Sequence, residues 1–191
     1  MGLDIHIGTD NYEELHSADY YDEKNDYFNK HNLSRTFCNL MSRQYVASNE
    51  PELNQIGIIT GVDITPLYDM EKYSDEYNCE QQLSFASNEK EREEVLKRIE
   101  MDNDNLKGNI DLVLKTVNSL IQALSRINNL DQKLDAGGED TLGYDFYFTH
   151  KMTDKGQGYI GNNFGQDLRN FKRFLDFAKE SGTTTVWFNY G

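Results

Sequence analysis

Proline, cysteine and tryptophan are scarce in this sequence of 191 residues, which contains two prolines, two cysteines and one tryptophan. Cys38 and Cys79 lie far apart, which excludes a disulfide framework and a CxxC zinc site, and we expect both thiols to be reduced. No apolar run reaches the roughly 20 residues that a membrane-spanning helix needs. The first residues lack the basic and apolar regions of a signal peptide. We therefore expect a cytoplasmic protein that does not contact membranes.

Basic residues are outnumbered by acidic ones. The chain has 19 Lys and Arg against 33 Asp and Glu, which gives a formal net charge of −14. Nucleic-acid binding depends on cations that displace counterions from phosphates, so this balance argues against direct nucleic-acid binding and favours a protein partner with a basic surface. The charge is uneven, because residues 1–80 carry −11, residues 81–141 carry −4 and residues 142–191 carry +1.

Hydrophobic residues make up 37% of the chain, and twelve tyrosines and ten phenylalanines are among them. Each aromatic ring buries a large area, and disordered chains are poor in aromatic residues. The composition therefore indicates a folded protein with a core rich in rings. The length is that of a single domain spanning residues 1–191.

Strands are predicted near both ends of the chain. Apolar and polar residues alternate over 3–7 and 142–148, a short strand follows at 159–160, and residues 183–190 are strongly β-prone. The two middle strands are predicted to form a hairpin. The fold class is α+β: a small, mostly antiparallel sheet of about four strands, with both termini contributing, packed on helices that include a helical insertion over 33–135.

The middle of the chain is predicted to be helical. Apolar spacing and the positions of the two prolines predict three short helices within residues 33–73. Residues 74–88 are polar and are predicted to be irregular. A further amphipathic helix is predicted to begin near Gln166 and to end at Gly182, because glycine commonly follows the last turn of a helix.

A long helical pattern covers residues 89–134 and is weakest at 102–108, where Asp, Asn and Gly disfavour a helix interior. One straight helix would be ~69 Å long at ~1.5 Å per residue, which exceeds a compact body of this size. We predict two helices packed as a hairpin, with a protruding helical arm as the alternative. The apolar seam over 106–134 has a heptad spacing and is also a possible homodimer interface. The seam consists of Leu106, Ile110, Val113, Val117, Leu120, Leu124, Ile127 and Leu134.

The most unusual stretch is residues 10–31, which holds seven acidic and five aromatic residues without a clear helical or strand period. In one interpretation it is scaffold that lies against the body with its rings inward and its acids outward. In the other it is a binding surface, because aromatic side chains are enriched in binding hot spots and carboxylates attract a basic partner. The candidate binding residues are Tyr12, Glu13, Glu14, Asp19, Tyr20, Tyr21, Asp22 and Tyr27.

Motifs of the common catalytic classes are missing: the sequence has no P-loop, no GxSxG elbow and no HExxH motif. We expect no cofactor, and the leading hypothesis is an acidic interaction or regulatory protein rather than an enzyme. The alternative is a small metal-dependent hydrolase. Asp4 and His6 share one face of the first predicted strand, and with Asp145 and His150 they would offer carboxylate and imidazole ligands to a divalent metal.

Two short stretches resemble a known group of proteins. Residues 1–5 (MGLDI) and 32–41 (NLSRTFCNLM) resemble a loose group of small, uncharacterised bacterial and phage-borne proteins. The resemblance implies a prokaryotic, phage or mobile-element origin and an unassigned function. It transfers no site residues to this chain.

Overall fold

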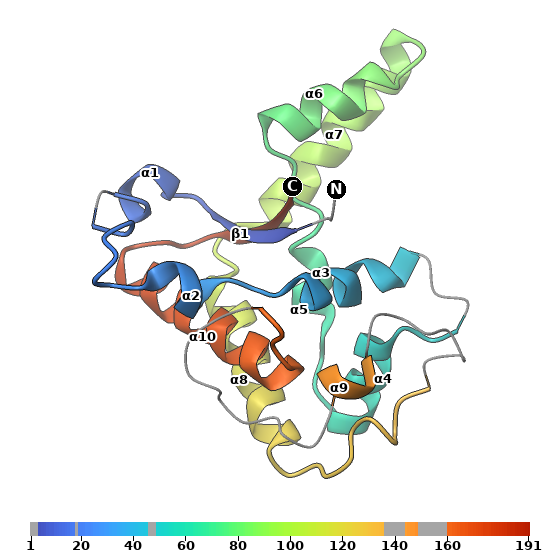
Figure 1. The fold of residues 1–191 in the computed structure, drawn as a ribbon. Coiled ribbons are helices and arrows are strands. Elements are labelled where there is room, and N and C mark those ends of the chain that lie inside the picture. The colour runs from blue at the N-terminus through green and yellow to red at the C-terminus, as the bar shows by residue number, and fades with distance from the viewer. Residues whose placement is uncertain (1–3, 18, 46–48, 136–143, 149–159) are drawn as a thin grey trace.

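The computed structural model of the chain describes residues 4–17, 19–45, 49–135, 144–148 and 160–191 (Figure 1). The two ends of this chain meet in a two-stranded antiparallel sheet. Strand β1 (Ile5–Thr9) pairs with β2 (Val186–Tyr190), and both termini contribute, as predicted. The described residues form these two strands rather than about four. Within the strand predicted at 159–160, Ile160 lies in a turn and residue 159 is outside the described residues.

The strand predicted over 142–148 is wrong for the described part of that range, where α9 (Tyr144–Tyr147) is a short helix. Tyr147 and Phe148 are both buried, and their ring centroids lie 5.1 Å apart. Phe148 also contacts Phe164, with centroids 5.6 Å apart. Consecutive residues of a strand point to opposite faces, so two neighbouring rings in one apolar cluster suit a helical turn and not an extended chain.

Strand β1 continues through Gly8 to Thr9, beyond the predicted strand over 3–7. Gly8 lies opposite Trp187 of β2, and a Cβ atom at Gly8 would come within 2.3 Å of the Trp187 indole nitrogen. The indole ring in turn stacks on Tyr73, with ring centroids 3.9 Å apart. Glycine is therefore required here by the close approach of a large ring and not by a turn.

Helices α8 (Ile110–Leu124) and α10 (Phe164–Glu180) pack against each other and form the centre of the molecule. Around them lie α3 (Arg35–Ser42), the 3₁₀ helix η1 (Arg43–Tyr45), α4 (Glu52–Thr60) and α5 (Thr65–Asp69), which confirm the three short helices predicted within 33–73. The largest fully buried side chains of the core include Phe37, Leu40, Met41, Leu53, Ile56, Leu120 and Phe171.

The long helical pattern breaks at Gly108, within the predicted stretch, where φ is +73°. It forms α7 (Glu89–Leu106) and α8, but the predicted hairpin between these two helices is wrong. Helix α7 instead packs against α6 (Glu76–Ser84), in a segment predicted to be irregular, and the two helices project from the body as an arm (Figure 1). The apolar seam of α8 faces α10 and α5, so α7 keeps only Ile99 and Leu106 buried.

Asp167, in the first turn of α10, ties several elements together. Its carboxylate accepts hydrogen bonds from the Ser34 backbone N–H at 3.0 Å, the Ser34 hydroxyl at 2.5 Å, the Tyr147 hydroxyl at 2.7 Å and the Asn162 amide at 2.9 Å. Burial raises the pKa of Asp167 to about 6, and these hydrogen bonds oppose that rise. Ser34 also caps α3, so one carboxylate fixes the start of α3 relative to α10.

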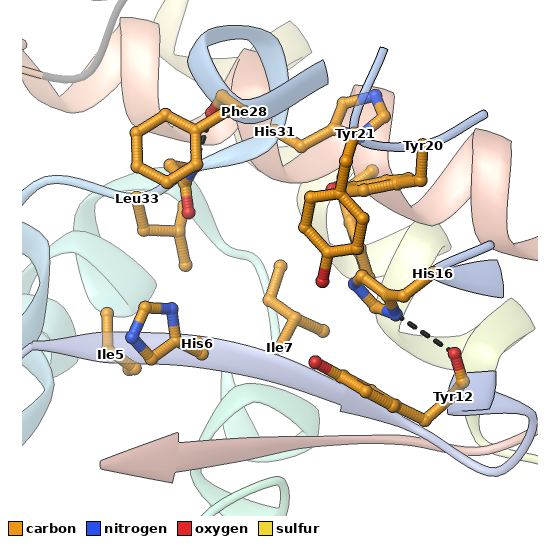
Figure 2. A pocket seen from close by; sticks show the side chains of 12 residues that line it. Ile5, His6, Ile7, Tyr12, His16, Tyr20, Tyr21, Phe28, His31 and Leu33 are labelled. Carbon is orange, nitrogen blue, oxygen red and sulfur yellow. Dashed lines mark hydrogen bonds between the residues drawn. The ribbon is translucent and has the colours of Figure 1, made fainter. Parts of the chain in front are cut away.

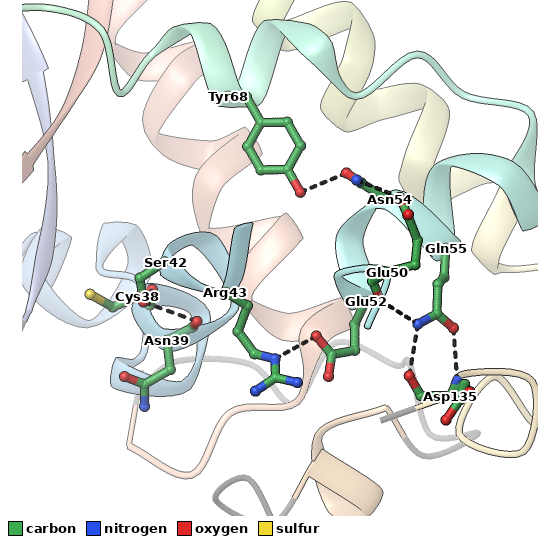
Figure 3. A network of polar contacts seen from close by, with 10 residues as sticks. All are labelled: Cys38, Asn39, Ser42, Arg43, Glu50, Glu52, Asn54, Gln55, Tyr68 and Asp135. Carbon is green, nitrogen blue, oxygen red and sulfur yellow. Dashed lines mark hydrogen bonds and ion pairs between the residues drawn. The ribbon is translucent and has the colours of Figure 1, made fainter. Parts of the chain in front are cut away.

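A second polar network joins η1 to α4 and to the chain that follows α8 (Figure 3). The Arg43 guanidinium donates to Glu52 at 2.7 Å, and both side chains are buried. Gln55 exchanges two hydrogen bonds with the backbone of Asp135, at 2.8 and 2.7 Å. These contacts are structural, because they hold η1 and the chain after α8 onto α4.

No helix among the described residues has both the length and the apolar character that a bilayer crossing requires.

Candidate functional site: an aromatic cleft beside strand β1

Residues 10–31 lie against α10 and contain two short helices, α1 (Tyr12–Leu15) and α2 (Tyr27–His31). The rings of Tyr20, Tyr27 and His31 gather around Phe177 of α10, with ring centroids 5.6, 4.8 and 5.2 Å from it. His31 is buried, although histidine is usually found closer to the surface. This part of the segment matches the scaffold interpretation, because its rings complete the apolar surface of a core helix.

The rest of the segment is turned toward solvent. Its candidate carboxylates are exposed, and so are three of its rings: the exposed fractions are 51% for Tyr12, 63% for Tyr21 and 57% for Phe28. Single exposed rings are common on protein surfaces. Here three exposed rings come from one short segment and line the same cleft. The four exposed candidate carboxylates are those of Glu13, Glu14, Asp19 and Asp22.

The exposed rings border a cleft of about 290 Å³ between β1 and the 10–31 segment, which we call the aromatic cleft (Figure 2). Ile5 and Ile7 of β1 contribute apolar surface to it, and Figure 2 shows the phenol groups of Tyr12 and Tyr21 reaching over Ile7. None of the described residues that line it is Asp, Glu, Lys or Arg. The lining residues are Ile5, His6, Ile7, Tyr12, His16, Tyr20, Tyr21, Phe28, His31, Asn32, Leu33 and Phe174.

Three of the eight predicted binding residues, Tyr12, Tyr20 and Tyr21, line this cleft. Tyr27 lies behind it against Phe177, and the four carboxylates lie outside the lining. The structure therefore separates the predicted set into a concave aromatic part and an exposed acidic part.

Two of the three histidines that line the cleft, His16 and His31, were not among the predicted binding residues. Each follows a tyrosine by four residues, the spacing that brings side chains together on one helix face. His16 stacks on Tyr12 with ring centroids 4.1 Å apart, and His31 stacks on Tyr27 with centroids 5.1 Å apart. The repeated Tyr-x-x-x-His spacing was therefore an available signal.

Two histidines and two tyrosines of the cleft lining are uncharged at neutral pH. Burial lowers the pKa of His31 to about 4, helped by the nearby cations Arg173 and Lys30. Burial also lowers the pKa of His16, so both imidazoles are neutral. Burial raises the pKa of Tyr20, and a hydrogen bond with Tyr12 raises the pKa of Tyr21, so both phenols keep their protons.

The two cations behind His31 are held by backbone carbonyl groups. The Lys30 ammonium donates to the Asn25 carbonyl at 2.6 Å, and the Arg173 guanidinium donates to the Lys30 carbonyl at 3.2 Å. Neither residue lines the aromatic cleft.

A second cavity of about 440 Å³ continues the aromatic cleft along β1 toward Asp4. The two cavities share five lining residues, and the second adds Arg35 and the strongly exposed Ile160. Arg35 is ion-paired with Asp4 at 3.2 Å, so its charge is balanced there. The shared residues are Ile5, His6, Phe28, Asn32 and Leu33.

The polar sheet face required by the hydrolase alternative is not formed as predicted. Asp4 is paired with Arg35, and His6 is exposed on β1. Asp145 belongs to helix α9 and not to a strand, and His150 lies outside the described residues. Within the described part of the chain, no three His, Cys, Asp or Glu side chains come close enough together to hold a metal ion.

The seam proposed for a homodimer is largely used within the chain. Its members from Leu106 to Leu124 are buried, and Ile127 and Leu134 are partly buried against the same core. A homodimer through 106–134 stays a prediction, and the apolar side chains that it would use are already covered by α10 and α5.

Comparison of the chain with protein-family models, with curated proteins and with solved structures finds no match in any of the three. The resemblance of residues 1–5 and 32–41 to small bacterial and phage-borne proteins therefore stays a prediction.

Proposed function

We propose that this protein is a non-enzymatic interaction protein that binds a basic segment of a protein partner at the aromatic cleft and its acidic surroundings. The observation that carries the proposal is that the rings and the carboxylates of residues 10–31 occupy different positions on the surface. The rings of this segment line a concave surface, while its carboxylates stand exposed around the same stretch of chain. Aromatic side chains supply contact energy, and exposed charges steer the partner.

The charge distribution supports a basic partner. Residues 1–80, which include the 10–31 segment, carry a net charge of −11, whereas residues 142–191 carry +1. Charged surfaces raise the rate at which oppositely charged partners associate, and the effect weakens as salt is added. Binding at this site should therefore depend on salt.

The experiment compares two variants of equal net charge. The first neutralises the site: Glu13→Gln, Glu14→Gln, Asp19→Asn and Asp22→Asn. The control neutralises four exposed acids of the arm: Glu80→Gln, Glu89→Gln, Glu93→Gln and Glu100→Gln. Both change the net charge from −14 to −10, so they differ only in where the charge is removed.

Each protein is titrated with a fluorescent peptide rich in arginine and lysine, and is immobilised to capture proteins from a bacterial lysate at low and moderate salt. We expect the site variant to lose peptide affinity and to lose captured proteins that the arm variant retains. Equal binding by the two variants contradicts the proposal, because total charge alone would then explain the interaction.

A further inference from the structure

We infer that the aromatic cleft receives the guanidinium group of an arginine side chain from an extended segment of the partner, an inference that rests on the proposed function. The size of the cleft, its chemistry and its continuation along β1 support this occupant.

The size of the cleft suits one side chain. Its volume of about 290 Å³ is just below the ~300–1,000 Å³ range of small-molecule pockets. A long side chain with an apolar stem matches the lining, because Ile7 and Leu33 offer apolar surface and Tyr12, Tyr21 and Phe28 offer rings. A cation placed over such rings is attracted by their electron-rich faces.

The absence of acidic groups from the described lining favours arginine over lysine. A lysine ammonium is strongly hydrated, and it would lose that hydration in a cleft that offers no carboxylate in return. The guanidinium group is more weakly hydrated, stacks on aromatic rings and carries five donors. The phenol oxygens and imidazole nitrogens of the cleft offer acceptors to those donors, and exposed carboxylates nearby supply the long-range attraction.

The continuation of the cleft favours a chain segment over free arginine. The second cavity adjoins the first along β1 and shares Phe28 and Leu33 with it. The backbone that carries the arginine can therefore lie along β1. Its neighbouring residue would meet Ile160 and Phe28, both exposed, so an apolar neighbour fits best.

The test uses three short capped peptides of serine and glycine that differ at one central residue: arginine, lysine or citrulline. Citrulline has nearly the shape of arginine without its charge. Binding is followed by NMR, through the aromatic signals of the protein and the side-chain signals of the peptide. We expect saturable shifts of the Tyr12, Tyr21 and Phe28 rings, upfield shifts of the arginine methylene protons, and about tenfold weaker binding for citrulline.

The double variant Tyr12→Leu and Tyr21→Leu should weaken binding of the arginine peptide about tenfold, since it keeps apolar surface but removes two ring faces. The matched control is Tyr77→Leu and Phe85→Leu on the arm, which removes two exposed rings far along the chain and should bind as the wild type does. The ring shifts of the wild-type protein provide the same test if the Tyr12 and Tyr21 variant fails to fold.

The outcomes separate this inference from the proposed function. If citrulline binds as well as arginine, or the shifts appear on the arm, the inference is wrong. The carboxylate variant could lose affinity for the basic peptide while the Tyr12 and Tyr21 variant keeps it. In that case the proposed binding of a basic partner is supported, and the inference that the cleft binds arginine is wrong. If neither variant differs from the wild type in binding, the proposed function and the inferred arginine site are both wrong.

Discussion

The 10–31 segment and the arm formed by α6 and α7 are both strongly charged and both carry aromatic residues, yet they are held in different ways. The segment has no regular period, but Leu15 and His31 are buried and its rings pack on Phe177. The arm has regular helices, but none of the nine described residues of α6 is buried. Whether a side chain is buried therefore depends on the apolar surface that other elements place next to it. It does not depend on how regular the local sequence pattern is.

The reason lies in the helices that receive each region. α10 presents Phe174 and Phe177 toward the segment, so rings at irregular spacings find apolar partners. The arm has no such helix beneath it, and Tyr77 and Phe85 remain 72% and 79% exposed. The contacts at its base include two hydrogen bonds of 3.0 and 2.9 Å between Asn103 and the Ser74 backbone.

The largest effect is expected at Asp167, which anchors the body of the molecule and has no counterpart in the arm. Asp167→Ala would leave the buried donors of Ser34, Tyr147 and Asn162 without their acceptor. We expect a loss of about 3–5 kcal/mol in the free energy of unfolding, measured by denaturant titration. Asp176→Ala, on the same helix but paired only at the surface with Lys172, should cost less than about 1 kcal/mol.

His31 allows the packing of the segment to be followed by pH. Folded His31 stays neutral down to about pH 4, whereas the unfolded chain takes up a proton near 6.5. The unfolded state binds more protons in this window, so the stability of the wild type should fall as the pH falls from about 6.5 to about 4. His31→Phe removes this proton uptake while keeping a ring next to Tyr27.

The stability difference between the wild type and His31→Phe should change by on the order of 3 kcal/mol across that window. Asp167 acts in the opposite direction, because its raised pKa makes stability fall as the pH rises from about 4 to about 6. Asp167 is common to both proteins, so its contribution cancels in the difference. A difference that does not vary with pH would mean that His31 is accessible to solvent.

Phe177→Ala tests the contact between the segment and α10 directly. It removes the ring that Tyr20, Tyr27 and His31 share, and we expect a loss of about 2 kcal/mol, because the ring is only partly buried. NMR signals of the three rings should shift at the same time. Unchanged ring signals would contradict the placement of the segment.

The smallest effect is expected on the arm. The double variant Tyr77→Ala and Phe85→Ala removes two rings that contact little, and the free energy of unfolding should stay within about 0.5 kcal/mol of the wild type. The same denaturant titration measures it. A loss comparable to that of Phe177→Ala would show that the arm unfolds together with the body and would remove the contrast between the two regions.

Much of the fold follows from local pattern. The short helices within 33–73, the break near Gly108, the end of α10 just before Gly182 and a strand near each terminus agree with the predictions, because caps, glycines and apolar spacing act over a few residues. The errors are non-local. α6 was missed because its helix is completed by contact with α7, and α9 was predicted as a strand because a few alternating rings suit either structure.

The candidate site shows the same limit. Its aromatic and acidic composition was visible in residues 10–31, and three tyrosines of the cleft were predicted. The contributions of Ile5, Ile7 and Phe174 were not, since these residues come from β1 and α10.

The amino-acid sequence by itself determined a strongly acidic N-terminal part, a high content of aromatic residues and a strand near each terminus. Tertiary structure alone decided which rings became core and which became the wall of a cleft. The physical reason is that burial depends on the surface that a distant element presents. α10 offers that surface to Tyr20 and Tyr27, whereas Tyr12, Tyr21 and Phe28 stay more than half exposed.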